Sequence, residues 1–156
     1  SSRRNLFKTA ALLPFAAPSI TNALSACPPK SQNCLSTTWT AKDGNIPKAL
    51  TEIFESYPEE GQGKVDLGGW SFVENNLSDT GTATLEYKSG IGNFARFLNG
   101  GKPFIDDVNI EVKGNKIEIK SSSRVGESDF GVNQMRLQFL AIKAREKGWD
   151  APDPTY

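Results

Sequence analysis

Residues 108–120 read VNIEVKGNKIEIK, and this stretch carries the strongest indication of the fold. On both sides of Gly114-Asn115 apolar and polar residues alternate, which is typical of strands with one buried face. A Gly-Asn pair between two such runs is typical of a two-residue hairpin turn. The register places Glu111 opposite Glu118, a mildly unfavourable pair that the neighbouring lysines can offset. The stretch therefore predicts an antiparallel β-hairpin.

The segments around the hairpin predict further strands and two helices. Residues 70–73 and 82–88 have the composition and alternation of strands. Residues 46–57 and 132–147 have apolar residues at helical spacing, and Asn45 is placed to cap the first of these helices. A helix, a run of strands and a second helix predict an α+β fold: an antiparallel sheet of about four to five strands, with helices packed on one face.

Each predicted helix has an apolar stripe that we expect to face the core. The stripe of the first helix consists of Ile46, Ala49, Leu50, Ile53 and Phe54. The stripe of the second helix consists of Val132, Met135, Phe139 and Ile142, widened by Leu140 and Ala144.

The first residues of the chain have the pattern of an export signal. Residues 2–8 read SRRNLFK, which resembles a twin-arginine signal. A short apolar stretch and the small residues before Cys27 complete the pattern of a cleavable signal, so we expect cleavage after Ala26. Two alternatives are lipidation of Cys27 in a lipoprotein-type cleavage box and an ordinary N-terminal amphipathic helix.

Composition divides the chain into four parts. Residues 1–26 form the predicted targeting segment, and a proline pair marks a linker over 27–44. A single α+β domain is predicted over 45–150, followed by a tail over 151–156. The apolar stretch of the targeting segment is short and interrupted by prolines, so no transmembrane span is expected.

The composition excludes several classes of site. The chain has no histidine, which excludes His-based triads and His-ligated zinc. Residues 1–26 contain three basic residues and no acid, which leaves 15 basic and 18 acidic residues in the rest. A mildly acidic body is a poor candidate for nucleic-acid binding. We predict no metal, no cofactor and no nucleic-acid partner.

The two cysteines, Cys27 and Cys34, are close enough in sequence for a disulfide. In an oxidising compartment we expect them to pair, and in a reducing one to remain two thiols. Their spacing is not that of a CxxC redox motif.

The densest polar cluster is SSSRVGESDFGVNQMR, residues 121–136, directly after the hairpin, with Asp106-Asp107 directly before it. Because the two ends of a hairpin lie side by side, these segments should approach each other. The candidate ligand-binding residues are Asp106, Asp107, Arg124, Ser128, Asp129, Asn133 and Arg136.

Two hypotheses explain this cluster. In the first, Arg124 binds an anion near the start of the second helix. In the second, Arg124 pairs with a partly buried carboxylate, Asp129 or Asp107, while Ser128 or Asp129 caps the helix. Asp106 and Asp107 should lie on opposite faces of the sheet, which argues against an acid–base pair, and we predict no catalytic residue.

The strings FIDDV at 104–108 and RVGxSDxGVNxxR at 124–136 resemble the domain-of-unknown-function 1499 family, as does NCLS at 33–36. The resemblance runs from about Cys34 to the end of the second helix. The family usually has an arginine near position 120 and often one at position 134, where this chain has lysine and glutamine. If those arginines bind a family ligand, this chain lacks them.

The resemblance implies an α+β domain whose role is not established, found in bacteria and photosynthetic eukaryotes, often with export or plastid signals. We expect a non-enzymatic accessory subunit of a photosystem or its antenna, in the thylakoid lumen or associated with the thylakoid. The alternative location is the bacterial periplasm. The alternative function is a binding module for an anionic small molecule or lipid, and a third hypothesis is an enzyme built on Asp106, Asp107 and Arg124.

Overall fold

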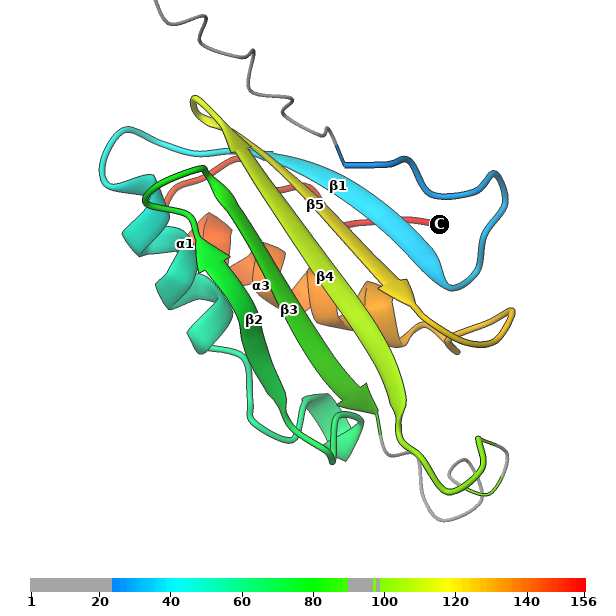
Figure 1. The fold of residues 1–156 in the computed structure, drawn as a ribbon. Helices are drawn as coiled ribbons and strands as arrows, with labels where there is room; N and C mark the ends of the chain where they lie inside the picture. Colours follow the sequence, from blue (N-terminus) through cyan, green and yellow to red (C-terminus); the bar gives the residue numbers. More distant parts are fainter. Residues whose placement is uncertain (1–23, 90–96, 98) are drawn as a thin grey trace, which may run out of the picture.

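The computed structural model describes residues 24–89, 97 and 99–156 and contains a five-stranded antiparallel sheet. The strands follow the order β1-β5-β4-β3-β2, and Figure 1 shows α1 and α3 together behind one face of the sheet. This confirms the predicted α+β class. The strands are β1 (Cys34–Thr40), β2 (Trp70–Asn76), β3 (Thr82–Ser89), β4 (Phe104–Lys113) and β5 (Lys116–Ser123). The helices are α1 (Ile46–Glu55), the short 3-10 helix η1 (Gln62–Lys64) and α3 (Val132–Glu146).

The β4–β5 hairpin forms in the predicted register. Glu111 lies opposite Glu118, and the Lys113 Nζ lies 3.2 Å from a Glu111 carboxylate oxygen and 3.5 Å from one of Glu118. A lysine therefore lies between the two like charges, as expected. Gly114 takes a φ of 63° in the turn, a left-handed conformation that glycine adopts without steric cost.

Helix α1 begins and packs as its sequence indicates. The Asn45 side chain accepts a hydrogen bond from the Lys48 amide at 3.1 Å, and proline follows in the first turn. Leu50, Ile53 and Phe54 are buried against the sheet. The predicted cap and stripe of this helix are confirmed.

The predicted core stripe of α3 is only partly correct. Met135 and Ile142 lie largely outside the core, whereas the buried face of the helix includes the polar side chains of Asn133 and Arg136. An apolar-periodicity argument assigns a charged residue to the solvent side. Here Arg136 faces the sheet because it pairs there with the buried carboxylates of Asp66 and Asp106. The buried residues of α3 are Val132, Asn133, Arg136, Leu137, Leu140, Ala141 and Ala144.

The predicted linker over 27–44 contains an edge strand of the sheet. Strand β1 pairs antiparallel with β5 and contributes the fully buried Trp39 to the core. Only Leu35 and Trp39 are apolar on its inward face, and threonine stands between them, so the alternation is too weak to identify the strand. The boundary predicted at residue 45 therefore falls inside the folded domain.

The predicted tail over 151–156 runs back along the molecule. Asp150 forms a bridge with Thr40, and Ala151 is buried. The Gln134 side chain donates a hydrogen bond to the Pro154 carbonyl at 3.1 Å. These contacts carry the last residues from the end of α3 towards its beginning.

Cys27 and Cys34 form a disulfide, which ties the segment before β1 to the first residue of that strand. A sulfur in a disulfide cannot also carry a thioether-linked lipid, so this bond contradicts the lipidation alternative. The arginine pair of the targeting pattern lies outside the described residues. In the described part of the chain, no helix is long and apolar enough to cross a bilayer.

Candidate functional site

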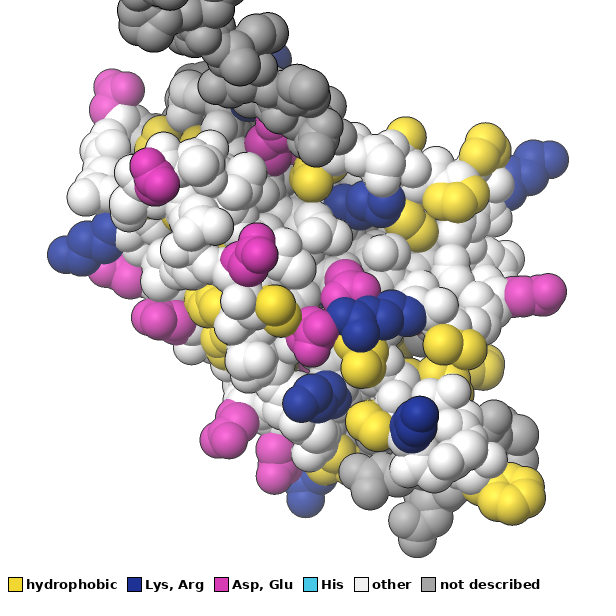
Figure 2. Space-filling model, in the orientation of Figure 1, with side chains coloured by type: hydrophobic (Ala, Val, Ile, Leu, Met, Phe, Trp, Pro, Cys, Tyr) yellow, Lys and Arg dark blue, Asp and Glu magenta, His cyan; other side chains and the backbone are white. Residues whose placement is uncertain are grey.

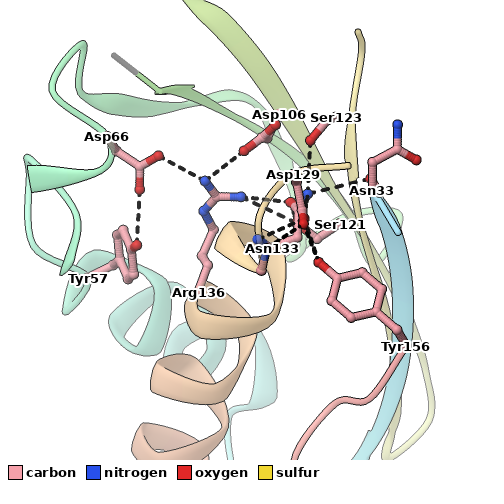
Figure 3. Close-up of polar contacts among 11 residues, drawn as sticks. Asn33, Tyr57, Asp66, Asp106, Ser121, Ser123, Asp129, Asn133, Arg136 and Tyr156 are labelled. Carbon is pink, nitrogen blue, oxygen red and sulfur yellow. Dashed lines mark hydrogen bonds and ion pairs between the residues drawn. The ribbon is translucent and has the colours of Figure 1, made fainter. Parts of the chain in front are cut away.

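The predicted polar cluster lies at one end of the sheet, where β3 and β5 end and β1 and β4 begin. α3 starts beside this end, so its first turns meet the strand ends. Figure 3 shows the side chains that gather between the sheet and the helix, with the Arg136 guanidinium at the centre. The cluster brings together residues that are far apart in the sequence, from the loop before β2, strands β4 and β5, the start of α3 and the C-terminal tail.

Arg136 is fully buried and pairs with two buried carboxylates. Its Nη2 lies 2.8 Å from Asp66 Oδ1 and 2.9 Å from Asp106 Oδ2. Its Nη1 donates to Asn133 Oδ1 at 2.8 Å, and its Cζ lies 4.1 Å from the centroid of the Tyr87 ring. Two carboxylates around one guanidinium leave the trio with a formal charge of −1. The positive charge of an arginine buried in this way is balanced by carboxylates inside the protein.

Asp66 was not predicted from the sequence, although it is as deeply buried as Arg136. It comes from the loop between η1 and β2 and accepts a hydrogen bond from the Tyr57 hydroxyl at 3.0 Å. Burial first, and then the Asp66 charge, raise the pKa of Tyr57 to about 12. The backbone at Gly61 passes so close to the Asp66 side chain that a Cβ at Gly61 would lie 2.5 Å from Asp66 Oδ2. The sequence around Asp66 shows a loop composition and no motif that marks a buried acid.

The N-cap residue of α3 is Gly131, and Asp129, one of the two predicted caps, bonds the first amides of the helix from two residues before it. Its carboxylate accepts hydrogen bonds from the amides of Gly131 at 2.8 Å and Asn133 at 3.1 Å. The Asn133 side chain donates to it at 2.6 Å and the Tyr156 hydroxyl at 2.6 Å. Partial burial and the Asp129 carboxylate raise the pKa of Tyr156. Ser128 is exposed, and its hydroxyl accepts the Phe130 amide at 3.2 Å.

Arg124 lies on the opposite, open face of the sheet. Its Nε and Nη2 each lie 2.7 Å from an Asp107 carboxylate oxygen, and Nη2 lies 2.5 Å from Glu86 Oε1. Asp107 was one of the two partners predicted for Arg124. The Asp107 side chain is 23% exposed, so the carboxylate is partly buried as predicted, whereas the Arg124 side chain is 44% exposed. The hydrogen bonds that Arg124 donates to Asp107 and Glu86 raise its pKa.

Six of the seven candidate residues therefore form two groups on opposite sides of the sheet. Asp107 and Arg124 lie on the open face, and Asp106, Asp129, Asn133 and Arg136 lie in the buried network. Asp106 and Asp107 are separated as expected from strand alternation, and Ser128 lies exposed in the loop before α3. Figure 2 shows the open face, where acidic and basic side chains are interspersed among uncharged ones. Within the described ranges, no three side chains able to ligate a metal lie together.

Both arginines of the cluster are in ion pairs, and the carboxylates of Asp66, Asp106, Asp107 and Asp129 all accept hydrogen bonds from neighbouring side chains. An anion clamp needs a cation that is free to meet its ligand, and an acid–base pair needs two carboxyl groups open to a substrate. The described geometry offers neither arrangement. It is the arrangement of an internal network that joins the sheet, the loop before β2 and α3.

Two buried atoms of this network have no hydrogen-bond partner among the described residues: the Tyr87 hydroxyl and the Arg136 Nε. The Tyr87 ring stacks against Trp70 and contacts Tyr57 edge-on. Burial is the main cause of the raised pKa of Tyr87. The ring contributes packing, whereas the hydroxyl has no hydrogen-bond partner among the described residues.

Tyr87→Phe is therefore expected to raise the free energy of unfolding by about 1 kcal/mol, because it removes a buried unsatisfied polar group and keeps the ring. Chemical denaturation of the purified protein measures the change. The matched control is Tyr57→Phe, which removes a hydroxyl that donates to Asp66 and should lower stability. A loss of stability in Tyr87→Phe similar to that of the control would show that the Tyr87 hydroxyl is bonded in solution.

The family model described as "Protein of unknown function (DUF1499)" matches residues 94–143. The DUF1499 match includes β4, β5 and most of α3, and so contains all seven candidate residues. It covers less than half of the chain and does not include Tyr57, Asp66 or Tyr87. A search of curated proteins found no match to this chain.

Proposed function

We propose that this protein is a non-enzymatic accessory subunit that docks on a larger assembly. The observation that carries the proposal is the internal pairing of the polar cluster. Arg124 pairs with Asp107 and Glu86, and Arg136 pairs with Asp66 and Asp106. The cluster therefore maintains the fold rather than presenting a reactive group. A function outside the cluster must use the surface, and surface recognition is what an accessory subunit provides.

The assembly that we propose is a photosystem or its antenna, in the thylakoid lumen or associated with the thylakoid. Support comes from the twin-arginine-like pattern of residues 2–8 and from the plastid signals that the family resemblance implies. The Cys27–Cys34 disulfide is a further argument for an exported protein, because disulfides persist in oxidising compartments. The bacterial periplasm would satisfy the same argument.

The alternative, a binding module for an anionic small molecule or lipid, requires a cation that is not already paired. Of the two candidate arginines Arg124 is the more exposed, and it pairs with the carboxylates of Asp107 and Glu86. The pairing favours the accessory-subunit proposal over this alternative.

Mild-detergent extraction of native membranes tests the proposal. The extract is separated by native electrophoresis, and this protein is located in the gel by mass spectrometry. We expect it to migrate with photosystem or antenna proteins, in a band far heavier than the free protein. Recovery solely in the free soluble pool would refute the proposal.

A further inference from the structure

The open face of the sheet carries a carboxylate that is almost completely buried. Alternation along β4 directs Ile110 into the core and Glu111 to the open face. The Glu111 side chain is nevertheless only 5% exposed, whereas the side chains of Glu86, Asp107 and Glu118 on the same face are 23–40% exposed. A side chain that points outward is buried only where another part of the chain lies over it.

The segment directly before the disulfide lies over this part of the open face. The Leu24 amide donates a hydrogen bond to a Glu111 carboxylate oxygen at 3.3 Å. The Lys120 ammonium donates to the Ser25 hydroxyl at 2.9 Å. Because Glu111 belongs to β4 and Lys120 to the adjacent β5, the two contacts place this segment across both strands. Residues Leu24, Ser25 and Ala26 are named the cover segment.

The disulfide holds the cover segment beside the sheet. Cys27 follows the segment directly, and its bond to Cys34 fixes it at the first residue of β1, the neighbour of β5. Leu24 and Ser25 are only two or three residues from that fixed point. Little chain entropy is therefore lost when their hydrogen bonds form, because the loop that they close is short.

The cover segment ends where the sequence predicts cleavage. Removal of residues 1–26 would take away the amide that bonds Glu111 and the hydroxyl that bonds Lys120. Glu111 would keep the Lys113 ammonium at 3.2 Å, which it shares with Glu118. A carboxylate and an ammonium on adjacent strands would each lose a partner and become accessible from outside. Cleavage therefore changes this part of the open face from covered to free.

We infer that the cover segment is an autoinhibitory contact: it blocks a docking surface at Glu111 and Lys120 on the open face, and cleavage after Ala26 releases that surface. The cover segment also indicates what docks there. A peptide segment of the assembly that offers a backbone N–H to Glu111 and an oxygen to Lys120 makes the same two contacts. The inference rests on the proposed function and adds to it the docking surface and its control by processing.

Carboxylate labelling of the folded protein tests the cover. Coupling of glycine ethyl ester by a carbodiimide, read by mass spectrometry, gives the labelling of Glu111 relative to that of Glu118. This ratio should be low in the full-length chain and about threefold or more higher in the chain that begins at Cys27, because labelling requires an open side chain. In the full-length chain, Leu24→Pro removes the donating amide and should also raise the ratio. The matched control is Ala26→Pro, which keeps the Leu24 amide and should leave the ratio low.

Rebinding to membranes tests the inhibition. Membranes from a strain that lacks this protein receive equal amounts of the full-length wild type, the chain that begins at Cys27, or full-length Leu24→Pro. Mild-detergent extraction and native electrophoresis then give the fraction in the large assembly, and mass spectrometry verifies that the full-length chains are uncut. The fraction should be about tenfold higher for the shorter chain than for the full-length wild type, because a partner must first displace the cover segment. Leu24→Pro should recover part of this difference although residues 1–23 are still present.

Each other outcome contradicts a different part of the inference. Equal labelling ratios in the full-length and shorter chains would show that the cover segment does not protect Glu111. If the shorter chain does not fold, equal ratios in Leu24→Pro and Ala26→Pro would show the same. Equal fractions of the full-length and shorter chains in the assembly would overturn the inhibition and leave the proposed function standing. A native protein that is found in no assembly would refute the proposed function, and this docking surface with it, whatever the labelling shows.

Discussion

Arg136→Met is expected to lower the free energy of unfolding by about 3–5 kcal/mol, because it leaves buried carboxylates without their cation. Methionine has a length similar to that of arginine, so the change removes the charge and the hydrogen bonds with little change in volume. Asp66 and Asp106 would then lie unpaired in the core, and the contact with the Tyr87 ring would be lost. Chemical denaturation followed by tryptophan fluorescence measures the loss.

The control for this prediction is Arg124→Met, the same substitution in the exposed ion pair. Exposed pairs contribute little because water and salt screen them, so the melting curve should hardly move. Adding Asp66→Asn and Asp106→Asn to Arg136→Met should restore part of the lost stability, because buried amides cost less than buried charges. Equal losses in the two arginine variants would contradict the assignment of Arg136 as the central structural cation.

Loss of the disulfide is the second large effect that we expect. Replacing Cys27 and Cys34 together with serine should lower the free energy of unfolding by roughly 2.5 kcal/mol, from the closed-loop entropy of a short loop. The two cysteines are seven residues apart in the sequence. The bond also anchors Asn33, whose carbonyl accepts the Ser123 amide at 2.9 Å. Denaturation of the double variant and of the wild type measures the loss.

A reducing agent provides the matched test of the same bond. It should destabilise the wild type by about as much as the serine substitutions do, and it should leave the double variant unchanged. Substitution of one cysteine alone is less informative, because it leaves a free thiol. A wild type whose unfolding does not respond to the reducing agent would show that the bond is absent or does not constrain the unfolded chain.

The elements that the sequence predicts well are those decided by neighbouring residues. The hairpin at 108–120 follows from strict alternation around Gly114, and the start of α1 follows from Asn45 and the proline after it. In both cases the residues that determine the structure are within a few positions of one another. A pattern of that range is visible in a single sequence.

The candidate site was only partly predictable. The string at 121–136 correctly indicated a polar cluster and that Asp129 bonds the first amides of α3, although the N-cap residue itself is Gly131. It did not indicate which arginine is buried, because the hairpin places Arg124 beside Asp106-Asp107 but leaves open where α3 directs Arg136. The decision depends on the face of the sheet to which each is directed, and on α3 being turned so that Arg136 points inward.

The sequence by itself therefore determined the hairpin, the two helices and the α+β class, because hydrophobic periodicity and capping act over a few residues. Only the tertiary structure decided that Arg136 is the buried centre, since its partner Asp66 is 70 residues away in the sequence. Only the tertiary structure placed the weakly patterned strand β1 in the sheet and left Met135 and Ile142 outside the core. The physical reason is that burying a charge requires a compensating charge at the same point in space, and no local pattern records where the rest of the chain will supply it.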